Sequence, residues 1–164
     1  MSAAVEFREL LDYSDHERRK WGEWVDTDRH RMDIAFQAGG SFATVGSLFD
    51  HIFLVEVRHS YRLQGKELPT ESGLEPHDID ALFAYAELGR EGVRQFLTTV
   101  GIDDLNQARD DKVASGVYRM SPRKLLFHMV LHEVRHWAQI AVAVRMAGFS
   151  PPGDHDLFYS KALI

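Results

Sequence analysis

The sequence of 164 residues contains no cysteine, and this absence removes several kinds of chemistry at once. The chain can form no disulfide, no thiolate metal site and no cysteine nucleophile. Any thiol chemistry would therefore use a thiol that another molecule supplies. Because a chain without disulfides suits a reducing compartment, we expect a cytoplasmic protein.

The chain also lacks the segments that direct proteins to membranes or to nucleic acids. No uncharged apolar run approaches the roughly 20 residues that a membrane-spanning helix needs. The N-terminal stretch contains Glu6, Arg8 and Glu9, so it has no apolar centre of a secretory signal. The formal net charge is −6 and no run of Lys and Arg is present to neutralise phosphates. We expect neither a membrane nor a nucleic-acid partner.

What is present is typical of one globular domain. Hydrophobic residues make up 45% of the chain and charged residues 27%, with 5 prolines. A chain of this length normally folds as one domain around its own core. Since no internal repeat or domain linker interrupts the sequence, we predict a single domain over residues 1–164.

The spacing of the apolar residues predicts four helices and little β-structure, that is, an all-α four-helix bundle. The second helix begins after the Gly39-Gly40 pair, with Ser41 or Thr44 as its N-cap. The expected helices cover residues 4–25, a second segment that ends at 63, residues 77–100 and residues 121–147.

The last helix and the connection before it carry distinct signals. Ser121 is in the N-cap position, Pro122 is in the first helical position, and Gly148 comes just after the end. Residues 101–120 form a connection that is long for a bundle, so we expect it to contain structure of its own or to cover part of the molecule. Within it, VASGVYRM is the candidate for a short extended piece.

Three histidines recur at every fourth position of the last helix, in HMVLHEVRHWAQI. Residues four apart lie on the same face of a helix, so His128, His132 and His136 form one inward stripe. They could be structural histidines with hydrogen-bond partners across the bundle, but three inward imidazoles are costly without a use. His128 and His136 are about 12 Å apart along the axis, so one ion can take only an adjacent pair. Another helix would have to supply a third ligand.

His51 is the leading candidate for that third ligand. It lies in the middle of the second helix, one turn from Leu48 and one turn from Val55, and so faces inward. His59, two turns later on the same side, is the second candidate, although a histidine that closes the end of the bundle is its ordinary explanation.

The letters HEVRH also match H-E-x-x-H, in which two histidines bind zinc and the glutamate is the general base of a metallopeptidase. No glutamate follows Glu133, and the extended motif fails at Gln139 and Val142. Asp154 or Asp156 could complete a zinc site, but no strand is expected that would bind an extended peptide. For Glu133 we favour an acid that faces solvent or pairs helices, with orientation of an imidazole as the alternative.

Three segments resemble the DinB-like superfamily of bacterial four-helix proteins. The last segment is the most specific, because the family shows a histidine pair four apart, a glutamine, an aliphatic helix that ends in glycine, two prolines and an aspartate. Trp137-Ala138 departs from the family, which often has arginine and glycine there. The segments are ELLDYSDHERRKW, GSFATVGSLFDHIFLVEVRHSYRL and HMVLHEVRHWAQIAVAVRMAGFSPPGDHDLFY.

The resemblance implies a divalent metal at His51, His132 and His136. It makes His128 an accessory residue of the pocket or a packed residue, and we add His59 to the accessory group. Zinc or nickel is the expected ion, and iron is possible because three imidazoles suit all three metals. Apart from the resemblance, Glu133 is the candidate catalytic base, with Glu56 as the alternative, if the metal activates a water in a hydrolase. Family bundles are often dimers, so we expect a homodimer.

The resemblance also implies an activity, since family members include thiol S-transferases that use bacillithiol or mycothiol and mycothiol-dependent isomerases. We therefore expect a metal-dependent enzyme that transfers a low-molecular-weight thiol to an electrophilic small molecule. One alternative is a metal-dependent hydrolase of small molecules. Another is a non-catalytic stress-response protein that binds a metal or a ligand.

Overall fold

The computed structural model of the chain describes residues 6–36, 42–113, 115–160 and 162. The all-α prediction is confirmed, with helix ends close to those expected, whereas Gly39-Gly40 and Ser41 lie outside the described residues. No helix among the described residues is long and apolar enough to cross a bilayer. The long helices are α1 (Phe7–Asp26), α2 (Val45–Leu63), α3 (Ile79–Thr99) and α5 (Pro122–Met146). Short helical turns are η1 (Arg29–Asp33), α4 (Ile102–Asn106) and η2 (Leu157–Tyr159).

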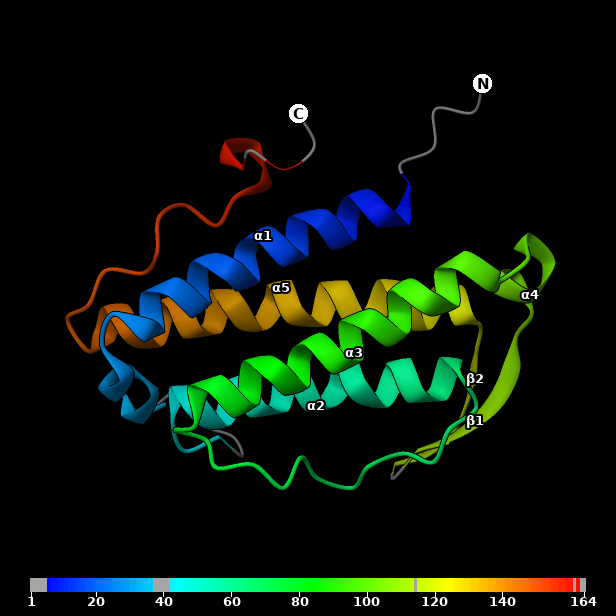
Figure 1. The fold of residues 1–164 in the computed structure, drawn as a ribbon, viewed down its shortest axis with the longest axis horizontal. Helices are drawn as coiled ribbons and strands as arrows, with labels where there is room; N and C mark the ends of the chain where they lie inside the picture. Colours follow the sequence, from blue (N-terminus) through cyan, green and yellow to red (C-terminus); the bar gives the residue numbers. More distant parts are fainter. Residues whose placement is uncertain (1–5, 37–41, 114, 161, 163–164) are drawn as a thin grey trace.

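The four long helices pack as a ring. Helix α1 contacts α3 and α5, and α2 contacts the same two helices. Figure 1 shows α1 and α5 running in one direction along the long axis of the molecule and α2 and α3 in the other. Because α2 and α3 are parallel neighbours, residues 64–78 connect them by crossing back along the bundle (Figure 1). Helices α2 and α5, which carry the histidines, are antiparallel neighbours.

The predicted cap residues define the ends of α2 and α5. The Thr44 side chain accepts a hydrogen bond from the backbone of Ser47, and the Ser121 side chain accepts one from Lys124. Each hydroxyl satisfies a backbone N–H that would otherwise lack a partner in the first turn. Gly148 follows α5 with a φ of +87°, a left-handed conformation that glycine adopts without steric cost.

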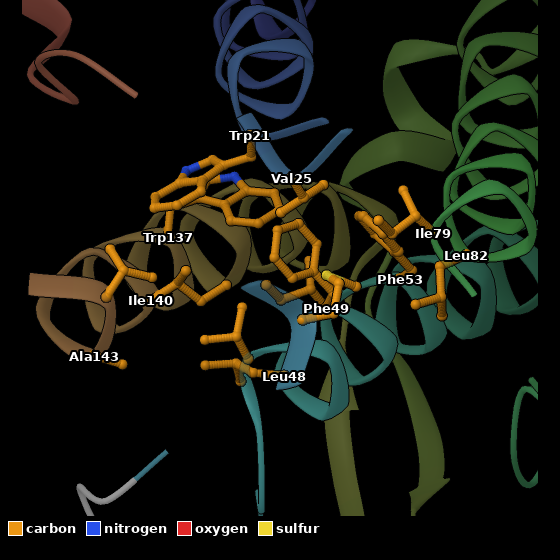
Figure 2. Packing of buried hydrophobic residues seen from close by; sticks show 14 of the residues in the cluster. Trp21, Val25, Leu48, Phe49, Phe53, Ile79, Leu82, Trp137, Ile140 and Ala143 are labelled. Carbon is orange, nitrogen blue, oxygen red and sulfur yellow. The ribbon is translucent and has the colours of Figure 1, made fainter. Parts of the chain in front are cut away.

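The core is built around aromatic side chains from three helices (Figure 2). Trp21 on α1 and Trp137 on α5 are stacked, with ring centroids 5.9 Å apart. Phe49 on α2 lies 6.4 Å from the first ring and 5.2 Å from the second. Both tryptophans are almost fully buried. The departure from the family at Trp137 therefore contributes a core residue, and such large rings dominate the energy of a core.

Between α3 and α5 the chain forms an antiparallel hairpin of β1 (Arg109–Val113) and β2 (Gly116–Met120). Strand β2 falls within the predicted extended piece, whereas β1 was not predicted. Its sequence, RDDKV, has no apolar alternation because neither of its faces enters the core. An ion pair between Arg62 on α2 and Asp111 on β1 links the hairpin to the bundle.

One charged side chain from each long helix enters the centre of the bundle. Arg18 on α1, Glu56 on α2, Arg90 on α3 and Glu133 on α5 are each at most 6% exposed. Arg18 pairs with both carboxylates, and Arg90 pairs with Glu56 at 2.9 Å and with Glu133 at 3.0 Å. Each charge thus contacts at least two opposite charges from other helices, and Arg90 also pairs with Asp15 on α1 at 3.1 Å. For Glu133, the sequence favours an acid that faces solvent or pairs helices. The structure shows that it pairs helices and does not face solvent.

We predict that Glu133→Gln lowers the free energy of unfolding by about 3–5 kcal/mol, because Arg18 and Arg90 then share one buried carboxylate, Glu56, and the centre of the bundle holds an unbalanced positive charge. Urea denaturation of the metal-free protein measures the change. Glu87→Gln is the control, since Glu87 is an exposed acid paired with Arg94 and should contribute under about 1 kcal/mol. Equal effects of the two substitutions would contradict a structural role for the central charges.

Candidate metal centre

The antiparallel packing of α2 against α5 brings three histidines together. His51 comes from α2, and His132 and His136 come from α5, one turn apart on one face. Their ligand nitrogens all lie within 4.8 Å of one another. The Nε2 atom of His132 is 3.1 Å from Nε2 of His51 and 3.0 Å from Nε2 of His136. Of the two candidates for a third ligand, His51 is the one that joins the pair.

Hydrogen bonding does not account well for both contacts of the central His132 nitrogen. A ring nitrogen of a neutral imidazole carries either one proton or one lone pair. It can therefore form one well-directed hydrogen bond, and a second ring nitrogen at 3.0–3.1 Å is left poorly satisfied. A cation that accepts a lone pair from each of the three nitrogens would satisfy all of them.

The surroundings keep the three imidazoles neutral. Burial, together with His136 and Arg58, lowers the pKa of His51 to about 4. Burial and the neighbouring histidines lower the pKa of His132 to about 3, and burial also lowers the pKa of His136. Neutral imidazole is the form that binds metal ions, so the rings are ready to bind at neutral pH.

The spacing of the nitrogens suits a first-row divalent ion. Metal–nitrogen bonds of about 2.0–2.1 Å place two nitrogens about 2.9–3.4 Å apart, depending on whether the angle is a right angle or tetrahedral. Two of the three separations, 3.0 and 3.1 Å, fall within that range, and the third, between His51 and His136, is within 4.8 Å. The residues present therefore fit zinc, nickel or ferrous iron, all of which accept imidazole.

Two further residues complete the site, and the sequence had given neither of them a role. The Oε1 atom of Gln139 lies 2.5 Å from Nδ1 of His136 and accepts a hydrogen bond from it in the tautomer protonated at Nδ1, which leaves Nε2 free to bind a metal. The Phe42 ring lies 4.7 Å from the His51 ring and 6.0 Å from the His136 ring, and so forms an apolar wall. The spacing of Gln139, three residues after His136, was the available signal.

His59 and His128 lie beside the three ligands, where the same two helices continue to pack. The Nε2 atom of His59 is 2.8 Å from Nδ1 of His128, a normal hydrogen-bond distance. The ring of His128 is 5.4 Å from that of His132. The structure thus places both predicted accessory residues next to the centre, in a row of five imidazoles. The prediction that His128 faces inward is wrong, because its side chain lies at the exposed edge of the stripe while His136 is buried.

The glutamate and the aspartates considered for a peptidase site lie elsewhere. The carboxylate oxygens of Glu133 accept hydrogen bonds from Arg18 and Arg90 at the bundle centre. Within the part of the chain that the structure describes, Asp154 and Asp156 do not belong to the group of potential ligands around the histidines. Glu133 therefore pairs helices in this structure, and its role as a catalytic base stays a prediction.

We predict that Gln139→Ala weakens zinc binding by about 10- to 100-fold, because His136 loses the group that fixes its tautomer. Competition with a chromogenic chelator measures the affinity. Gln139→Glu keeps an acceptor in place and should retain binding, whereas Gln95→Ala on the exposed side of α3 serves as a neutral control. Unchanged affinity in folded Gln139→Ala would show that this contact does not orient the ligand.

The comparisons with known proteins identify the family and support the fold. The sequence model of the DinB family matches residues 1–162. The chain is similar to the crystal structure of a DinB-like protein from Bacillus subtilis, with a TM-score of 0.54 and 17% identity over 92% of this chain and 96% of that chain. At that identity the likeness shows the fold alone, and no curated protein matches the chain. Since the family model covers nearly the whole sequence, the chain belongs to the DinB family.

Proposed function

We propose that the protein binds one divalent metal ion and uses it to transfer a low-molecular-weight thiol to an electrophilic small molecule. The ligands are His51, His132 and His136. The observation that carries the proposal is the convergence of three neutral imidazoles from two helices. Zinc or nickel is the proposed ion, with ferrous iron as the alternative.

The donor set supports this chemistry. An ion held by three neutral ligands keeps its positive charge and has room for a further ligand, so it would stabilise a thiolate. The chain contains no cysteine, so the thiol would come from a small molecule. Gln139 would orient His136, and the Phe42 ring would keep water from one side of the site. Membership of a family that includes thiol transferases supports the assignment.

The location and the assembly form part of the same proposal. The absence of cysteine supports a cytoplasmic location. A homodimer is supported by three large apolar side chains that are exposed on the outer face of α5, since such exposed groups are often buried by a partner. They are Leu131, Val142 and Met146.

The proposed site predicts the metal content of the protein. Purified protein should carry about one equivalent of metal per chain by elemental analysis, and His51→Ala should lose it because only two ligands remain. His30→Ala, which removes an exposed histidine on η1, should retain the metal. Metal retained by His51→Ala would mean that another residue completes the site.

Metal-dependent turnover separates an enzyme from a binding protein. A screen of small thiols against electrophiles should give a product that requires the metal, is lost on chelation and returns when zinc or nickel is added. Circular dichroism shows whether the chelated protein stays folded. If chelation lowers only the melting temperature and no thiol reacts, the protein is a metal-binding protein; metal-dependent turnover of esters or amides without a thiol would identify a hydrolase.

A further inference from the structure

A cavity of about 470 Å³ lies beside the histidines, within the range of small-molecule sites. Four parts of the chain form its walls: the second half of α2, the start of the 64–78 connection, the hairpin and α5. Figure 1 shows the hairpin reaching past the end of α2 to that connection. The cavity is lined by Val55, Arg58, His59, Arg62, Leu68, Pro69, Thr70, Lys112, Val113, Ser115 and His128.

The lining of this cavity is cationic although the whole chain is acidic. Arg58, Arg62 and Lys112 contribute three positive charges, and none of the described lining residues is an acid. The chain as a whole has a net charge of −6. A concave surface lined by one sign of charge raises the local concentration of ions of the opposite sign. The occupant that this lining favours is therefore an anion.

The three cations differ in how far other groups of the chain already engage their charge. The guanidinium of Arg58 donates to the backbone carbonyls of Pro69 and Thr70, which holds the connection in place but leaves its charge unneutralised. Arg62 is paired with Asp111. Among the residues that the structure describes, no carboxylate forms an ion pair with Lys112. Lys112 is thus the cation free to bind an anionic group directly.

The inner wall of the cavity is formed by residues that adjoin the metal centre, among them Val55, His59 and His128. His59 is 9% exposed, and its buried Nδ1 atom has no hydrogen-bond partner among the described residues. Val55, also in the wall, lies one turn from His51 on the same side of α2. The cavity therefore runs along α2 from the hairpin towards the metal ligands.

We propose that this cavity binds a small anionic molecule, with its carboxylate or phosphate group at Lys112 and Arg58 and its other end directed along α2 towards His51. The molecule is the substrate or cosubstrate of the metal centre, and this part of the assignment rests on the proposed function. The binding itself depends on the cavity and its charges and not on the metal.

The test is calorimetric titration of succinate and of inorganic phosphate into the full-length chain at low ionic strength, before and after chelation of metal. At least one anion should bind saturably in both forms, and the tighter of the two identifies the preferred group. Lys112→Ala should weaken binding about tenfold. Val55→Trp, which fills the inner part of the cavity, should abolish it.

Arg119→Ala is the matched control, because Arg119 is an exposed cation on the same hairpin that pairs with Asp110 and does not line the cavity. It should change the affinity by less than about twofold. The proposal is overturned if neither anion binds saturably, if both hairpin variants weaken binding equally, or if neutral succinamide binds as tightly as succinate. Binding that persists in chelated protein also separates this proposal from the metal site, whose failure would appear in the metal analysis instead.

Discussion

The structure depends on the four charges at the centre of the bundle, one from each long helix. Arg18, Glu56, Arg90 and Glu133 form a network in which every charge contacts two of opposite sign, and Arg90 has a third partner in Asp15. A buried charge without a partner is far more costly than the same charge in water. Sliding one helix by a turn, about 5.4 Å, would separate its charge from both partners. We infer that the network selects one register of the four helices, a role that buried polar groups have in some bundles.

That register matters to the metal centre because α5 contributes residues both to the charge network and to the histidine ligands. Glu133 directly follows His132, and Trp137 directly follows His136, each about 100° further around the helix. When Glu133 lies in the charge network and Trp137 in the aromatic core, the two histidines point to the flank that faces α2. The orientation of the ligands therefore follows from packing on the other sides of the same helix, which requires no flexible loop to hold them.

The sequence predicts the helices and the histidine stripe but not the pairing of the buried charges. Helix ends carry local cap signals, and a spacing of four residues alone places His132 and His136 on one face. His51 ranks ahead of His59 from local context, yet only the packing of α2 against α5 decides between them. Arg90 interrupts an apolar stripe on α3, which indicates a buried charge, but its partners come from other helices. The charged strand β1 has no alternation of apolar and polar residues that would predict it, because neither of its faces lies against the core.

The helices hold the histidines, whereas under the proposed function the connections determine what reaches them. Two connections, residues 64–78 and the hairpin, form part of the wall of the cavity beside the metal centre. Both are longer than a simple bundle requires. Surface connections tolerate substitution and insertion far better than packed helices do, because few buried contacts depend on them. Changes there could alter which small molecule fits while the charge network and the three ligands stay in place. Members of the family that share this fold and these histidines need not share a substrate, and the residues to compare for substrate choice are those of the two connections.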